Sequence, residues 1–121
     1  MTIFHDQAEF MTAANKPLPN ADVNELDLSA DLIEEEWIEW IDEEDYAISG
    51  NGNDLKETLD LIYVLAQYLN VRVGPDKAQQ LWDGLHKNNM SKCVNGKLVK
   101  RSDGKILKPV DYVKFNIDRY L

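Results

Sequence analysis

Apolar residues recur at intervals of three and four along most of the chain, the spacing of α-helices that each bury one face. The first such stretch predicts a helix over residues 3–15, which Pro17 and Pro19 close. Residues 20–28 lack a regular period and predict a polar connector. Ser29 is predicted to cap the second helix, whose apolar positions extend through two tryptophans.

A glycine- and asparagine-rich break at residues 49–53 predicts the end of that second helix. Asn53 or Asp54 is then expected to cap a third helix. This helix is apolar over much of its circumference, so we expect it to be the most buried element. Gly74-Pro75 predicts the start of a fourth helix, because proline is favoured at the first helical position, and residues 88–92 predict its end.

Beyond the fourth helix the pattern changes. Asn95-Gly96, flanked by apolar residues, is typical of a β-hairpin turn, and residues 102–105 indicate a second turn. The tail over residues 109–121 alternates polar and apolar residues and is expected either to extend a strand or to wrap the body. The sequence therefore predicts one all-α domain over residues 1–121, a bundle of four to five helices with a small C-terminal β-hairpin.

The charge is divided between the two halves of the 121-residue chain. Residues 1–60 hold 17 acidic and 2 basic side chains, a net charge of −15, whereas residues 61–121 hold 5 acidic and 11 basic side chains, a net charge of +6. Such a division suits a site in which an acidic half holds a cation and a basic half holds an anion. A chance distribution of solvated surface charge explains it equally well.

Other features of the sequence exclude several classes of function. The overall charge of −9 argues against non-specific nucleic-acid binding. The lone Cys93 leaves no internal disulfide and fits a reducing compartment, and no apolar run reaches membrane-spanning length. The two histidines, His5 and His86, form no pattern typical of a nucleophile or a zinc site. We expect a cytoplasmic protein with no membrane partner.

Two acidic pairs carry the candidate chemistry. Glu36 and Glu39 lie three residues apart in the second predicted helix, and Glu57 and Asp60 repeat that spacing in the third. Residues three apart share a helix face, so the pairs can converge if the two helices are antiparallel neighbours. Carboxylate oxygens suit Mg²⁺ or Mn²⁺. A solvated acidic face, or acidic residues that favour the helix dipole near a helix start, are the plainer explanations.

The sequence around these pairs resembles the metal signature of the all-α nucleoside triphosphate pyrophosphohydrolases, which include MazG-like enzymes, dimeric dUTPases and phosphoribosyl-ATP pyrophosphohydrolases. The similar segments are Leu-Ile-Glu-Glu-Glu-Trp-Ile-Glu, ending at Glu39, and Glu-Thr-Leu-Asp, ending at Asp60. A further segment from His86 to Pro109, which contains Asn-Met-Ser-Lys and Asp-Gly-Lys-Ile-Leu-Lys, is similar to the tail of small phosphoribosyl-ATP pyrophosphohydrolase-like members. This chain departs from many relatives in having Trp37 and Trp40 after the acidic residues.

The resemblance implies Mg²⁺-dependent hydrolysis of a nucleoside triphosphate between its α- and β-phosphates, which yields a monophosphate and pyrophosphate. It assigns the metal and the catalysis to Glu36, Glu39, Glu57 and Asp60, and Mn²⁺ is expected to substitute for Mg²⁺. Glu35, which lies four residues before Glu39, is a further catalytic candidate that could orient a metal-bound water. The residues that the resemblance suggests for phosphate or sugar contacts are Asn89, Lys92, Lys105 and Lys108.

Two alternatives stay open at this stage. Within the enzyme class, phosphoribosyl-ATP is a second candidate substrate. Outside it, a non-catalytic helical module could bind a nucleotide or a partner through the tryptophan-bearing helix. Because so few helices bury only a modest core, we also expect a homodimer or a higher homo-oligomer, in which basic residues of one subunit complete the site of the other.

Overall fold

The computed structural model describes residues 2–20, 22–43 and 52–121. Within them the chain is helical and forms no sheet, which confirms the all-α prediction. The predicted break at residues 49–53 lies partly outside the described residues. The elements are α1 (Ile3–Ala13), α2 (Val23–Glu43), α4 (Asn53–Val73), α5 (Pro75–Met90) and the short 3-10 helix η1 (Ile117–Tyr120).

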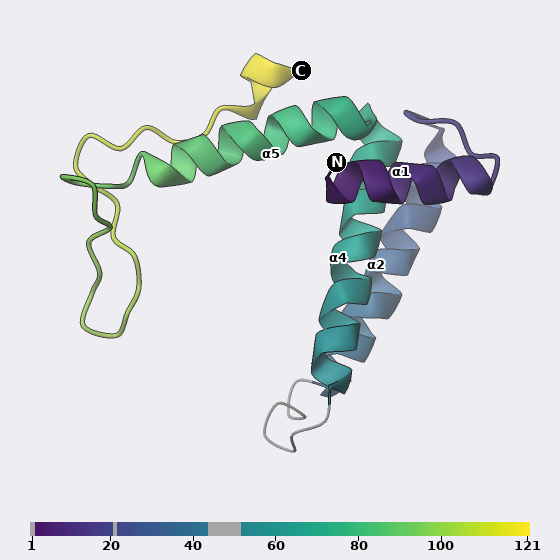
Figure 1. The fold of residues 1–121 in the computed structure, drawn as a ribbon, viewed down its shortest axis with the longest axis horizontal. Helices are drawn as coiled ribbons and strands as arrows, with labels where there is room; N and C mark the ends of the chain where they lie inside the picture. The colour runs from purple at the N-terminus through teal and green to yellow at the C-terminus, as the bar shows by residue number, and fades with distance from the viewer. Residues whose placement is uncertain (1, 21, 44–51) are drawn as a thin grey trace. The chain divides into compact units, whose positions relative to one another are not determined.

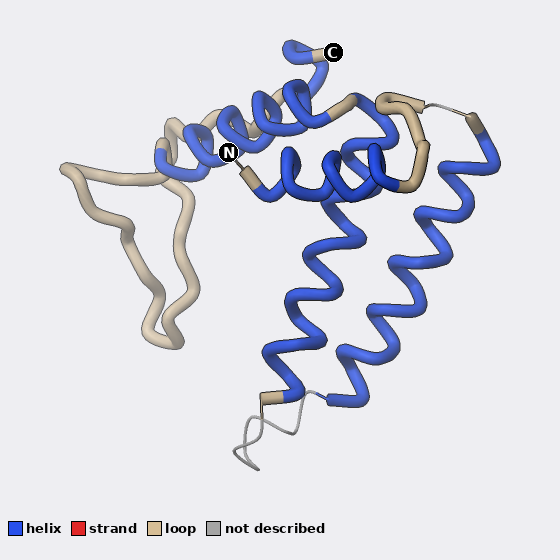
Figure 2. Tube along the Cα trace, turned by 45° about the vertical axis from the view of Figure 1, so that its right-hand side comes forward, coloured by secondary structure: helices blue, strands red, loops and turns tan. Residues whose placement is uncertain are grey.

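The chain forms two compact units, Met1–Ala78 and Gln79–Leu121, which divide within α5. In the first unit, α2 and α4 lie side by side and run in opposite directions, which is the arrangement that convergence of the two acidic pairs required (Figures 1 and 2). Helix α1 packs across the C-terminal half of α4 (Figure 1). Phe4, Ala66 and Ala78 form the buried apolar cluster at this junction, with partly buried aliphatic side chains around it.

Buried amides hold α1 against α4. The Asn70 side-chain amide donates to the Phe4 carbonyl oxygen and to Gln7 Oε1, both at 2.8 Å. Gln7 in turn donates to Gln67 at 3.3 Å. Asn70 and Gln7 are fully buried, and a buried amide costs free energy unless it is hydrogen-bonded, so this network favours one register of α1 on α4.

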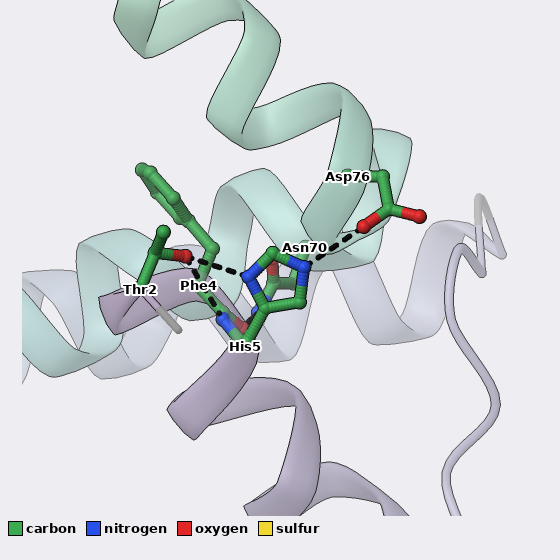
Figure 3. Close-up of polar contacts among 5 residues, drawn as sticks. All are labelled: Thr2, Phe4, His5, Asn70 and Asp76. Atoms are coloured by element: carbon green, nitrogen blue, oxygen red, sulfur yellow. Dashed lines mark hydrogen bonds and ion pairs between the residues drawn. The ribbon is translucent and has the colours of Figure 1, made fainter.

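A side-chain hydrogen bond also joins the start of α1 to the first turn of α5. His5 Nε2 lies 2.8 Å from Asp76 Oδ1, and His5 Nδ1 lies 2.7 Å from the Thr2 hydroxyl oxygen (Figure 3). The Thr2 hydroxyl also accepts the His5 backbone N–H and so caps α1. The His5 side chain therefore contacts both the residue that caps α1, Thr2, and a residue 71 positions later in the sequence, Asp76.

The predicted start of the second helix is wrong. Helix α2 begins at Val23, and the Asp22 carboxylate caps it by accepting the Asn24 N–H at 2.8 Å. Ser29, which was expected to be the cap, lies buried in the middle of the helix. Ser29 is 1% exposed and its hydroxyl oxygen has no hydrogen-bond partner in the structure, so it caps no helix.

The predicted C-terminal β-hairpin is not formed in the part of the chain that the structure describes. The turn itself is present, because Val94 and Lys97 exchange backbone hydrogen bonds of 2.7 and 3.1 Å around Asn95 and Gly96, which both have positive φ. Only isolated bridges follow, at Val94–Lys97 and Lys100–Ile106. Val94 and Ile106 remain exposed, and two strands without a packed face are marginal.

The third predicted helix is buried in its second half only, where Ala66, Gln67, Asn70 and Val71 are buried. On α4 the aliphatic residues Leu55, Leu59 and Ile62 are exposed in the single chain. These residues share one side of the helix, away from the side that carries Glu57. No helix among the described residues is long and apolar enough to cross a membrane.

Candidate metal centre

Three carboxylates from two helices meet in the first unit. Glu36 and Glu39 come from α2 and Glu57 comes from the first half of α4. One oxygen of each lies within 4.8 Å of the other two. The spacing of three residues places Glu36 and Glu39 on neighbouring parts of one α2 face, and the antiparallel pairing brings Glu57 opposite them. The convergence of these three predicted residues is therefore present in the fold.

The electrostatics of this cluster are unfavourable in the protein alone. One carboxylate oxygen of Glu36 and one of Glu57 are buried, and neither has a hydrogen-bond partner in the structure. Burial raises the pKa of Glu36 above its ordinary value of 4.5, and the nearby charges of Glu39 and Asp60 raise it further. Each effect disfavours the ionised form, and a cation bound among these oxygens would relieve all of them.

Asp60, the fourth predicted ligand, is held by a lysine. Its Oδ2 lies 2.7 Å from Lys56 Nζ, one helical turn earlier on α4, and the same ammonium lies 3.5 Å from Glu57 Oε1. Lys56 thus carries a positive charge at the edge of the cluster, and its pKa is raised chiefly by the Asp60 hydrogen bond and charge. For Asp60 to ligate a metal ion, its carboxylate would have to exchange this ammonium for the ion.

Glu35, the residue expected to orient a water, is exposed and lies outside the three-carboxylate group. It precedes Glu36 by one residue, so it projects about 100° away around α2. The structure therefore does not include Glu35 among the carboxylates that meet.

Glu43 is a residue that the sequence analysis did not single out. It lies seven residues after Glu36, which is nearly two turns along the same face of α2. One of its carboxylate oxygens is also buried without a hydrogen-bond partner in the structure. The seven-residue spacing was the signal that could have found it.

The two tryptophans of α2 form a stacked pair next to the carboxylates. Their ring centroids are 5.4 Å apart, with an interplanar angle of 26°. Trp40 donates its indole N–H to the Thr58 hydroxyl at 3.0 Å, which ties α2 to α4 beside Glu57. Trp37 is 48% exposed in the single chain.

The four basic and polar candidates lie in the second unit. The ammonium groups of Lys92 and Lys108 each lie 5.5 Å from the centre of the Tyr112 ring, a cation–π distance. The backbone N–H of Lys105 donates to the Asp103 carboxylate, and Asn89 is exposed at the end of α5. The fold therefore gathers Lys92 and Lys108 around one tyrosine.

The donor set fits a hard divalent cation. Mg²⁺ binds carboxylate oxygens at about 2.0–2.1 Å, so ligands on opposite sides of the ion are about 4.2 Å apart. Small rotations of the glutamate side chains would bring oxygens that now lie within 4.8 Å into one such sphere. The unpartnered buried oxygens of Glu36 and Glu57 are those for which an ion would supply the missing contact.

Comparison with protein-family models and with curated protein sequences finds no match to this chain.

Proposed function

We propose that this protein is a Mg²⁺-dependent nucleotide pyrophosphohydrolase that cleaves a nucleoside or deoxynucleoside triphosphate between the α- and β-phosphates. The observation that carries the proposal is the meeting of Glu36, Glu39 and Glu57 from two antiparallel helices, in which one oxygen of Glu36 and one of Glu57 are buried without a hydrogen-bond partner. The resemblance of the sequence to the MazG-like enzymes supplies the reaction. Mn²⁺ is expected to replace Mg²⁺, since both ions favour carboxylate oxygens.

In this proposal the chain's own residues have separate tasks. Glu36, Glu39 and Glu57 hold the ion, and Asp60 joins them by releasing Lys56. A bound Mg²⁺ would neutralise phosphate charge and lower the pKa of the attacking water. Glu35 remains the candidate for orienting that water. Phosphate or sugar contacts are assigned to Asn89, Lys92, Lys105 and Lys108.

The proposed active form is a homodimer. The stripe of Leu55, Leu59 and Ile62 on α4 is exposed in one chain, and Leu55 and Leu59 are each about two-thirds exposed. Contiguous apolar surface of this kind marks an interaction site, and a second copy of the chain would cover it by isologous contact. Such pairing would complete a helical bundle that a single chain leaves half-formed.

The test is release of pyrophosphate from a panel of common and modified triphosphates, with phosphoribosyl-ATP included. We expect at least one substrate to yield a monophosphate and pyrophosphate with Mg²⁺, and none to do so in EDTA. Glu39→Gln or Glu57→Gln should lower kcat/KM by about 100-fold or more. Loss of a residue that only hydrogen-bonds to a metal ligand already costs about 10- to 100-fold, and these two residues are proposed to be ligands themselves. Glu34→Gln, an exposed change on α2, is the matched control. No turnover across the panel would refute the proposal.

A further inference from the structure

The second unit contains a cavity of about 660 Å³ that the carboxylate cluster does not involve. It lies between the C-terminal part of α5, around Gly84 and Lys87, and the returning segment of residues 111–120. Pockets for small ligands commonly enclose about 300–1,000 Å³, so the space suits a molecule of metabolite size.

Specific contacts hold the returning segment in place. Asn88 donates its side-chain amide to the Val113 carbonyl oxygen at 2.9 Å and accepts the Tyr112 hydroxyl at 2.7 Å. Farther along, the Tyr120 ring lies so close to α5 that a Cβ atom at Gly84 would be 2.5 Å from it. These contacts bound the cavity, and a side chain larger than that of Gly84 would have to shift the Tyr120 ring.

The cavity wall is positively charged. Lys87, Lys114 and Arg119 line it, and Asp111 is the one acidic residue among the lining residues. None of the three basic side chains forms an ion pair with a residue that the structure describes. Like charges gathered around a hollow repel one another, and an anion bound there would relieve that repulsion.

Aromatic rings form another part of the wall. Phe115 and Tyr120 both line the cavity, with ring centroids 5.5 Å apart and an interplanar angle of 38°. A planar ring of a ligand could stack on such a surface while its anionic end meets the basic side chains. The combination favours a ligand with a phosphate at one end and a heteroaromatic ring at the other.

We propose that this cavity is a nucleotide-binding site in which Lys87, Lys114 and Arg119 bind phosphate and Phe115 or Tyr120 stacks on the base. The inference does not rest on the proposed hydrolysis, because binding here requires no metal ion. It concerns residues other than those that the sequence motifs suggest for substrate contacts.

The experiment is isothermal titration calorimetry of the full chain in EDTA, with AMP, UMP, adenosine and inorganic phosphate as separate probes. We expect AMP or UMP to bind at least tenfold more tightly than adenosine or phosphate. Lys87→Ala and Arg119→Ala should each weaken that binding by tenfold or more. Lys97→Ala, a charge-matched change at the exposed turn of the same unit, should alter it less than twofold.

Gly84→Ala provides a second variant that leaves every charge in place. Its added methyl group must displace the Tyr120 ring, while alanine favours the helix itself. We expect tenfold weaker nucleotide binding with unchanged or higher helical content by circular dichroism. Equal losses in Lys87→Ala and Lys97→Ala, phosphate binding as tight as that of AMP, or no binding at 10 mM nucleotide would each overturn the assignment.

Discussion

Glu36 on α2 and Glu57 on α4 each bury a carboxylate oxygen that has no hydrogen-bond partner in the structure, and oxygens of the two side chains lie within 4.8 Å of each other. Two partly buried carboxylates at this separation repel each other, and a bound cation would relieve that repulsion. Natural proteins retain such arrangements mainly where function requires them. The stability of the protein should therefore depend on divalent cations.

The first prediction concerns Glu36→Gln. In EDTA the variant should melt about 2–5 °C above the parent, the change expected for a free-energy difference of about 1 kcal/mol in a chain of this length. The reason is that the neutral amide removes one buried charge. Added Mg²⁺ should raise the melting temperature of the parent but not that of the variant.

Glu34→Gln, which neutralises an exposed carboxylate on the same helix, is the control for that comparison. It should leave both the melting temperature in EDTA and the Mg²⁺ response close to those of the parent. A Glu36→Gln protein that melts below the parent in EDTA would show that Glu36 stabilises the fold without a metal.

The second prediction is a pH dependence with a defined sign. Because the pKa of Glu36 is raised in the folded protein, the folded state binds this proton more tightly than the unfolded state does. The Glu36 contribution should therefore stabilise the fold progressively as pH falls through the folded pKa toward the ordinary value of 4.5, and should be absent well above the folded pKa.

Melting curves in EDTA from pH 7.5 down to pH 4.5, for the parent and for Glu36→Gln, would measure that contribution as their difference. The advantage of the variant at neutral pH should shrink as pH falls. Asp103 acts in the opposite sense, because Arg101 lowers its pKa, but its stabilisation is lost only below the ordinary value of 3.8. A difference between the two proteins that stays constant with pH would contradict the prediction.

The third prediction concerns Lys56, whose ammonium group partly neutralises Asp60 and Glu57. Lys56→Gln should lower the melting temperature in EDTA, because the carboxylates then lack their nearest positive charge. It should also enlarge the rise in melting temperature caused by saturating Mg²⁺, since the ion no longer competes with the lysine for Asp60.

Lys16→Gln offers a matched comparison, because Lys16 pairs with Glu25 at 3.3 Å away from the cluster. Its loss should change the melting temperature equally with and without Mg²⁺. If Lys56→Gln behaves in the same way as Lys16→Gln, Asp60 is not a metal ligand.

The sequence predicted the helices, and it indicated that Glu36, Glu39 and Glu57 could meet, for a simple physical reason. Helical periodicity fixes which residues share a face, and a short connection between two helices favours an antiparallel pair. Glu36, Glu39 and Glu57 follow from those two rules alone. Proline at position 75 marked the start of α5 for an equally local reason.

Other features depend on packing that no local pattern contains. Gln7 and Asn70 are polar, so hydrophobic periodicity did not predict that they are core residues. Both are fully buried, and they form a hydrogen bond with each other between α1 and α4. Ser29 and Asp22 are both residue types that favour helix caps, but Asp22 accepts the Asn24 N–H while Ser29 lies buried inside the helix. The Asn95-Gly96 turn formed as predicted, but strands need a surface to pack on, which the neighbouring sequence cannot supply.

The last prediction tests the proposed dimer through Leu59 on α4, which is 66% exposed in one chain. At tens of micromolar, light scattering should give about twice the 13.9 kDa chain mass. Leu59→Glu should shift the protein to monomer, because each subunit would then bury an unpaired charge at the two-fold contact. Val110→Glu, at a fully exposed position in the second unit, should leave the mass of the dimer unchanged. A monomeric mass for the parent protein at these concentrations would contradict the proposed dimer.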